Sequence, residues 1–153
     1  MTAIAFICTA NRCRSLMAHA ILVNEARKRS LNIEVYSAGV IDFSDQPPLE
    51  KTLKTCLHFN TQAPKTTPTF VLSLPLDAIN LFLAMERHHA DSLTREFGIS
   101  ASRVSLLGSF DPRKRGDEIS DPFFSYDEMV YRRSYELIRD CIVGYLDTTE
   151  NLA

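Results

Sequence analysis

The sequence lacks the features of membrane proteins, secreted proteins and nucleic-acid-binding proteins. None of its segments approaches the ~20 consecutive apolar residues that a membrane-spanning helix needs, and no positively charged segment precedes the short apolar run near its N-terminus. Its formal net charge of −2 provides no overall basic field of the kind that attracts nucleic acid. We therefore expect a cytoplasmic protein with neither a membrane partner nor a nucleic-acid partner.

Metal and disulfide signatures are also missing. The chain has four cysteines, which form neither a Cys-x-x-Cys motif nor a Cys/His spacing typical of zinc sites. The pair His88-His89 has no third ligand at metal-binding spacing, which favours a solvated surface for both side chains. We predict reduced thiols, no metal and no cofactor.

The residues that are present suit one globular domain of the α/β class. Of the 153 residues, 45% are hydrophobic and 24% are charged, and no repeat interrupts them, so we predict a single domain over residues 1–153. The predicted strands are residues 3–7, 33–39, 79–85 and 103–108. The predicted helices cover residues 13–28, the segment after Pro47-Pro48, residues 86–97, and the segment opened by a capping box of Ser125 and Glu128. Alternating strands and helices predict an open, three-layer sheet of parallel strands with helices on both faces.

The most informative segment joins the first predicted strand to the first predicted helix. The strand ends at Cys8, and the loop from Thr9 passes directly into a helix near Arg14. Backbone N–H groups of such a loop and of a helix start form a concave anion site, and their partial positive charges stabilise a thiolate. The planar guanidinium of an arginine grips two oxygens of a tetrahedral oxyanion. The segment predicts phosphoryl chemistry on cysteine, although Cys8 could also simply end a buried strand as a small apolar residue.

Four motifs, in this order and spacing, resemble those of the low-molecular-weight protein tyrosine phosphatases, which share their fold with thioredoxin-coupled arsenate reductases. They are Cys8-x-x-Asn11-x-Cys13-Arg14-Ser15, Ser37-Ala38-Gly39, Met85-Glu86 and Asp121-Pro122-Phe123. The resemblance implies four parallel strands in the order 2-1-3-4, with a phosphate-binding loop after strand 1. It also implies a cysteine-dependent phosphomonoesterase that acts on phosphotyrosine through a phosphocysteine intermediate.

The resemblance further implies a role for each matching residue. Cys8 would be the nucleophile, Arg14 would hold phosphate oxygens, and Asp121 would be the general acid and base. Ser15 would donate a hydrogen bond to the Cys8 sulfur, while Asn11 and Ser37 would bond to each other and support the loop. The remaining implied residues are the phosphate-binding loop residues Thr9, Ala10, Asn11, Arg12 and Cys13, and the substrate-groove aromatics Phe43, Phe123 and Phe124. Cys13 would also form a reversible disulfide with Cys8.

Three positions depart from the family pattern and leave alternatives open. Ala10 stands where glycine is usual, Leu16 stands where proline is usual, and the match nearest to a loop-supporting histidine is Thr61 or Gln62. The alternatives are a protein arginine phosphatase, an arsenate reductase and a phosphate-binding pseudo-enzyme. An arsenate reductase needs further poised cysteines, whereas Cys56 and Cys141 lie on predicted apolar helix faces. The expected partners are a phosphorylated protein or peptide, with phosphate or another tetrahedral oxyanion in the loop, and the expected assembly is a monomer or weak homodimer.

Overall fold

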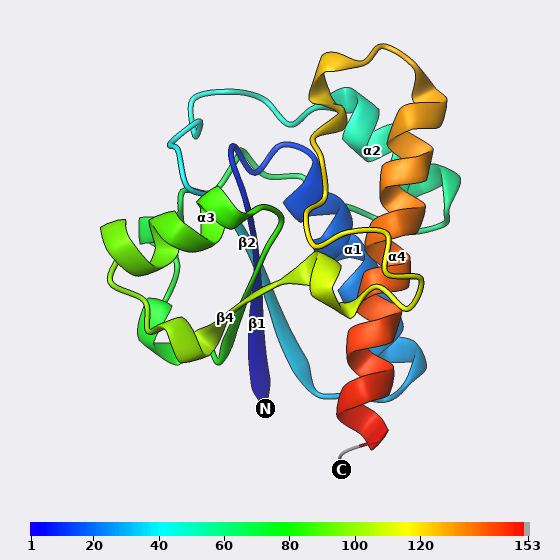
Figure 1. Ribbon diagram of the computed structural model, residues 1–153. Helices are drawn as coiled ribbons and strands as arrows, with labels where there is room; N and C mark the ends of the chain where they lie inside the picture. Colours follow the sequence, from blue (N-terminus) through cyan, green and yellow to red (C-terminus); the bar gives the residue numbers. More distant parts are fainter. Residues whose placement is uncertain (152–153) are drawn as a thin grey trace.

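The fold is built on one parallel sheet. The computed structural model describes residues 1–151 and forms strands β1 (Thr2–Cys8), β2 (Ile33–Gly39), β3 (Leu81–Ala84) and β4 (Val104–Leu106). They lie in the order β2-β1-β3-β4, and every neighbouring pair is parallel, as predicted (Figure 1). Because Cys8 pairs with Gly39 and Ile7 pairs with Ala84, the carboxyl ends of three strands meet at one edge.

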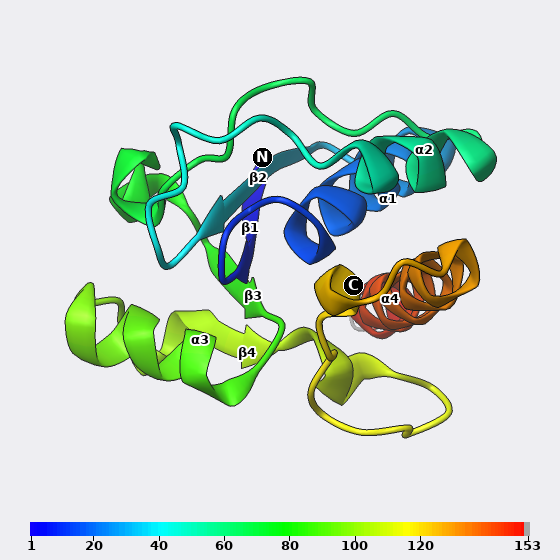
Figure 2. The same ribbon diagram turned by 90° about the horizontal axis from the view of Figure 1, so that it is seen from above.

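Helices cover both faces of this sheet, which confirms the three-layer prediction. The long helices α1 (Arg14–Lys28), α2 (Glu50–His58) and α4 (Glu128–Asn151) lie on one face (Figure 2). On the other face, α3 (Arg87–Asp91) continues into a π-helical turn at Ser92–Glu96. None of the helices within residues 1–151 is both long and apolar enough to cross a membrane.

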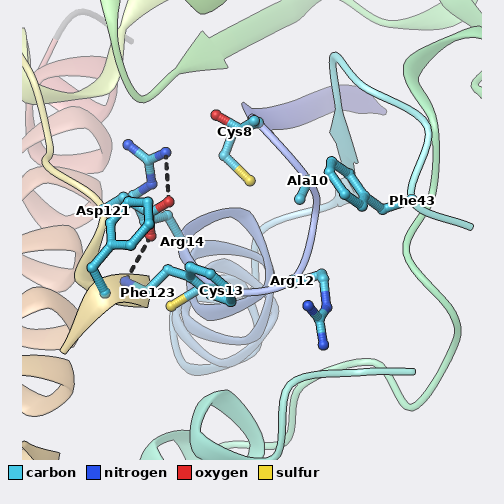
Figure 3. Close-up of a pocket in the computed structure, with 10 residues that line it drawn as sticks. Cys8, Ala10, Arg12, Cys13, Arg14, Phe43, Asp121 and Phe123 are labelled. Carbon is cyan, nitrogen blue, oxygen red and sulfur yellow. Dashed lines mark hydrogen bonds and ion pairs between the residues drawn. The ribbon is translucent and has the colours of Figure 1, made fainter. Parts of the chain in front are cut away.

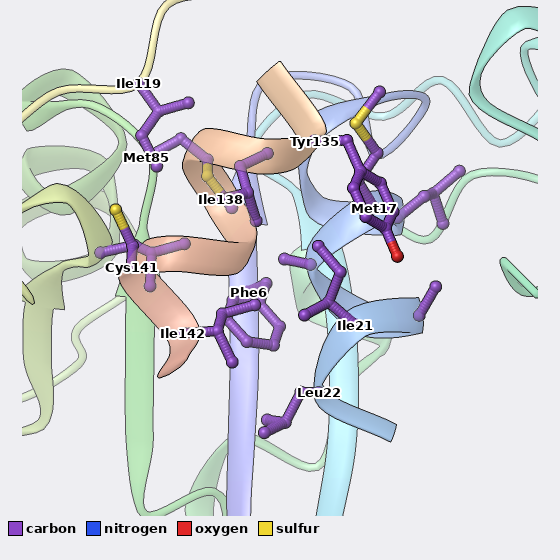
Figure 4. Packing of buried hydrophobic residues seen from close by; sticks show 14 of the residues in the cluster. Phe6, Met17, Ile21, Leu22, Met85, Ile119, Tyr135, Ile138, Cys141 and Ile142 are labelled. Atoms are coloured by element: carbon purple, nitrogen blue, oxygen red, sulfur yellow. The ribbon is translucent and has the colours of Figure 1, made fainter. Parts of the chain in front are cut away.

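Strand β1 supplies side chains to two separate cores because successive residues point to opposite faces of a strand. Ile4 and Phe6 pack with α1 and α4, whereas Ala5 and Ile7 pack against the α3 side. Figure 4 shows Phe6 between Ile142 of α4 and Ile21 of α1. Full burial of an isoleucine or phenylalanine side chain stabilises a fold by roughly 1.5–3 kcal/mol. The two cores therefore fix the strand whose last residue is Cys8.

Local hydrogen bonds shift some of the predicted boundaries. The predicted strand 79–85 begins only at Leu81, because the side-chain Oδ1 of Asn80 accepts the N–H of Ala3 at 2.8 Å in place of a backbone carbonyl. The predicted capping box is wrong. Helix α4 begins at Glu128, and Asp127 Oδ1 accepts the N–H of Met129 at 2.9 Å, which is a cap of the first turn by an acidic residue.

Candidate active site

The loop after β1 owes its shape to one residue in a left-handed conformation. Asn11 has a φ of 56°, a region that asparagine tolerates better than most non-glycine residues. Ala10 is outside that region, so it occupies the usual glycine position without backbone strain. The departure from glycine at Ala10 therefore does not distort the loop, because the residue with positive φ is its neighbour, Asn11.

The end of β2 holds this loop from the side. The N–H groups of Val40 and Ile41 donate to the carbonyls of Cys8 and Thr9, each at 3.0 Å. Gly39 lies directly under the loop: a Cβ at this position would be 2.6 Å from the Thr9 oxygen. Only glycine permits this close approach, which explains the glycine of the Ser37-Ala38-Gly39 motif.

Two donors point at the Cys8 sulfur. The backbone N–H of Asn11 donates to Cys8 Sγ at 3.3 Å, and Ser15 Oγ lies 3.0 Å from the same sulfur. Because Ser15 Oγ accepts a hydrogen bond from Asn11 Nδ2 at 2.7 Å, its own hydrogen is free to point at the sulfur. The arrangement is suited to a sulfur that carries negative charge.

The support of Asn11 differs from the predicted one. Its Oδ1 accepts the backbone N–H of Thr69 at 2.8 Å, while Ser37 Oγ bonds with His19 Nδ1 at 3.0 Å. The predicted Asn11–Ser37 hydrogen bond is thus wrong, because the side chain of Asn11 bonds with the backbone of Thr69 and that of Ser37 bonds with His19 of α1. Burial lowers the pKa of His19 to about 4.

Arg14 is almost completely buried at the base of the loop, with 1% of its surface exposed. Its Nη1 donates to Glu86 Oε2 at 2.7 Å and to the Ile119 carbonyl at 2.6 Å, which fixes the plane of the guanidinium. Partial burial of Glu86 opposes its ionisation, but the hydrogen bond and charge of Arg14 outweigh this and hold the pKa of the carboxyl below its usual value. The second nitrogen, Nη2, lies 3.6 Å from Asp121 Oδ2.

These residues surround one pocket of about 240 Å³ (Figure 3). The Cys8 side chain points into it, and Asp121 enters from the start of the turn Pro122–Phe124, where its Oδ1 accepts the Phe123 N–H at 3.0 Å. The pocket brings together residues from three segments far apart in sequence, namely Cys8, Thr9, Ala10, Arg12, Cys13 and Arg14, then Phe43, then Asp121, Phe123 and Phe124. Asn11, Ser15 and Ser37 are buried behind it.

The other cysteines are buried. Burial raises the pKa of the Cys13 thiol, and its predicted disulfide with Cys8 stays a prediction. Cys56 and Cys141 have no exposed surface, and burial raises the pKa of each to about 12. Their predicted place in the core is confirmed, and neither is accessible for the disulfide relay that an arsenate reductase needs.

The loop has a support that the sequence did not indicate. His89, predicted to be solvated, is fully buried, and its Nε2 lies 2.8 Å from Thr9 Oγ1. Its Nδ1 accepts the Glu86 N–H at 3.1 Å, so Nε2 carries the proton and donates to Thr9. Thr61 is not the supporting residue: its Oγ1 bonds with Tyr135 in the core. The sequence did not indicate this role, because the charged residues Glu86 and Arg87 before the histidines are typical of an exposed helix start.

His89 also brings Glu86 and the exposed His88 close together, with candidate ligand atoms of all three residues within 4.8 Å of one another. The expectation that the histidine pair has no third group nearby is therefore wrong. Glu86 Oε2 already accepts from Arg14, and both ring nitrogens of His89 are engaged by Glu86 and Thr9. The cluster holds the loop and the arginine in place.

Replacing His89 by alanine is expected to lower the free energy of unfolding at pH 7 by about 2 kcal/mol, because buried polar partners lose their hydrogen bonds. Burial, with the charges of His88 and Arg14, lowers the pKa of His89 to about 3 from 6.5. Between these values the unfolded chain binds more protons, so stability falls as pH falls from about 6.5 towards 3. In the His89→Ala variant, the free energy of unfolding is expected to depend less steeply on pH in this range.

Denaturant unfolding at several pH values measures both effects. His88→Ala is the matched control, since the exposed neighbour should shift stability by less than about 0.5 kcal/mol. Equal stability and equal pH slopes in the two variants would contradict the role assigned to His89.

Comparisons with known proteins agree with this geometry. A family model described as low molecular weight phosphotyrosine protein phosphatase matches residues 3–152. The chain is 29% identical over 148 residues to low molecular weight protein-tyrosine phosphatase A of Mycobacterium tuberculosis, which covers 94% of this chain and 89% of the relative. It is 31% identical over 147 residues to the protein-arginine-phosphatase of Geobacillus stearothermophilus, covering 91% and 90%. The crystal structure of a low molecular weight phosphotyrosine phosphatase from Vibrio cholerae aligns with a TM-score of 0.85 and 25% identity, covering 100% of this chain and 99% of that one.

Proposed function

The chain belongs to the low molecular weight phosphotyrosine protein phosphatase family, a family of phosphoric monoester hydrolases, and we propose from this that it removes the phosphoryl group of phosphotyrosine in proteins. The observation that carries the proposal is the single pocket that joins Cys8, Arg14 and Asp121 with aromatic walls. A thiol, an anion-binding fork and a carboxyl group are the three groups that a metal-independent phosphotransfer to cysteine requires.

In the first step the Cys8 sulfur attacks phosphorus. An S–P bond forms and the P–O bond to the tyrosine oxygen breaks, with the phosphoryl oxygens held by Arg14 and by loop N–H groups. A phenolate is a poor leaving group because the pKa of its conjugate acid is about 10. Asp121 lines the same pocket as Cys8 and can give its proton to this oxygen there.

In the second step water hydrolyses the phosphocysteine. Asp121, now a carboxylate, accepts a proton from the water while the water oxygen attacks phosphorus, and the S–P bond breaks. The departing sulfur carries negative charge, which the Ser15 hydroxyl and the Asn11 N–H stabilise. Phosphate then leaves and the thiolate is regenerated.

The walls of the pocket favour an aromatic substrate. Phe43 and Phe123 approach from different segments and can contact the faces of a tyrosine ring. Arg12 lies at the pocket, with its guanidinium carbon 5.9 Å from the Phe123 ring centroid and its Nε donating to the Pro47 carbonyl at 3.2 Å. Its positive charge would repel the cationic guanidinium of phosphoarginine.

The second candidate, a protein arginine phosphatase, is favoured by the relative from Geobacillus stearothermophilus. Parallel assays of one peptide carrying phosphotyrosine or phosphoarginine, under reducing conditions, separate the two. We expect kcat/KM to be at least about tenfold higher for phosphotyrosine, as like-charge repulsion of about 1.4 kcal/mol would produce. Faster hydrolysis of phosphoarginine would contradict this substrate. Phosphate binding without turnover of either peptide would indicate a pseudo-enzyme.

A further inference from the structure

A second hollow of about 430 Å³ lies beside the active site, between α2 and the first turns of α4. Figure 1 shows these two helices side by side, and they are in contact. The cations that line the hollow include Lys51, Lys54 and Arg132, and the carboxylates are Glu50 and Glu128. The catalytic steps proposed above use none of these residues.

The charges in this hollow do not cancel. Lys54 Nζ pairs with Glu50 at 3.4 Å and Arg132 pairs with Glu128 at 3.7 Å, each one turn apart on its own helix. Within the described part of the chain, Lys51 forms no salt bridge with a carboxylate. Lys51 therefore supplies the excess positive charge of the hollow.

Neutral groups hold the Lys51 ammonium in position. Nζ donates to the Ser125 carbonyl at 3.3 Å and lies 4.5 Å from the Tyr126 ring centroid and 5.6 Å from that of Tyr131. A carbonyl and two ring faces attract a cation without neutralising its charge. Because these contacts restrain the side chain, little conformational entropy is left to lose when an anion binds.

The hollow and the active-site pocket are separate, but neighbouring residues of one segment line both of them. Phe123 and Phe124 line the pocket and Tyr126 lines the hollow, with Ser125, the acceptor of the Lys51 bond, between them. On the other side, Thr52 Oγ1 donates to the Arg12 carbonyl in the phosphate-binding loop at 2.8 Å. A polypeptide whose phosphorylated side chain enters the pocket can therefore extend across residues 123–126 towards Lys51.

We propose that Lys51 forms a subsite for an acidic side chain that lies close in sequence to the phosphorylated residue of the substrate. The inference rests on the proposed function, since it requires a phosphorylated polypeptide. The ligand is a carboxylate of aspartate or glutamate. It contacts the Lys51 ammonium and adds binding energy without contact with the reacting phosphorus.

The test compares phosphotyrosyl peptides that carry either glutamate or glutamine at each of the three positions on either side of the phosphotyrosine. At one or more positions the glutamate peptide is expected to have a kcat/KM about three- to fivefold higher, mainly through a lower KM, as for a partly exposed ion pair. Lys51→Met keeps the apolar stem and removes the charge, so it should bring this ratio close to one. Lys51→Arg should preserve the ratio.

Each ratio is taken within one variant, so changes in basal activity cancel. Lys28→Met is the matched control: Lys28 is an exposed lysine in the last turn of α1 that pairs with Glu25, and its variant should keep the wild-type ratio. A wild-type ratio of one at every position, or an unchanged ratio in Lys51→Met, would overturn the subsite. Absence of turnover on the glutamine peptides would instead overturn the proposed function on which it rests.

Discussion

Replacing Cys8 by serine is expected to lower kcat by at least about three orders of magnitude. A serine hydroxyl is not ionised near neutral pH and is a poor leaving group from phosphorus, so both formation and breakdown of the covalent intermediate slow. The hydrogen bonds from Asn11 and Ser15 can still reach the hydroxyl, so the loop should keep its shape. Steady-state hydrolysis of an aryl phosphate, with phosphate binding measured by calorimetry, tests the loss of chemistry separately from binding.

Cys13→Ser is the matched control for this variant, because it also replaces a cysteine sulfur by a serine oxygen in the same loop. Cys13 lines the pocket and burial raises the pKa of its thiol, which makes it a poor nucleophile. We expect Cys13→Ser to lose far less activity than Cys8→Ser. If the serine variant at Cys8 kept near-wild-type turnover, or the variant at Cys13 lost more, the nucleophile would be misassigned.

Asp121→Asn is expected to reduce kcat for phosphotyrosine by about 10²- to 10⁴-fold, the usual contribution of a positioned general acid. The asparagine oxygen can still accept the Phe123 N–H, so the turn that holds Phe123 should be preserved. The loss should depend on the leaving group. Aryl phosphates whose phenols are more acidic need less protonation in the first step, so the loss in kcat/KM, which reports that step, should be much smaller for them.

A series of aryl phosphates with phenols of graded acidity measures this dependence for the wild type and the variant. Asp91→Asn, on the exposed side of α3, changes the overall charge equally and should leave the series unaltered. An equal loss on every substrate would show that Asp121 acts through the position of Arg14 or the turn, and would contradict its role as general acid.

Much of the fold followed from periodicity in the sequence. The continuous apolar run of strand β1 predicts a strand buried on both faces, and the helical spacing after it predicts an amphipathic helix, so the two cores and the parallel sheet were predictable. The contiguous strand, cysteine loop and helix likewise predicted the anion site. The family resemblance also implied roles beside Cys8 for Asp121 and Phe43, and both residues line the same pocket as Cys8.

The supports of the loop were not predictable, because they depend on tertiary contacts between segments with no common period. His89 lies next to charged residues and reads as solvated, yet its helix packs so that the ring reaches Thr9. Asn11 and Ser37 each find other partners, at Thr69 and His19. Ala10 is tolerated because the residue with the left-handed φ is Asn11, and the sequence does not indicate which loop residue adopts that conformation.

The most direct test of a covalent phosphocysteine is to trap it. With Asp121→Asn and an aryl phosphate of an acidic phenol, the first step proceeds while activation of water is impaired, so the intermediate should accumulate. Acid quench within the first turnover, followed by mass spectrometry of the peptides, should locate one phosphoryl group on Cys8. A phosphoryl group on another residue, or continued turnover with no labelled peptide in the first turnover, would contradict the account.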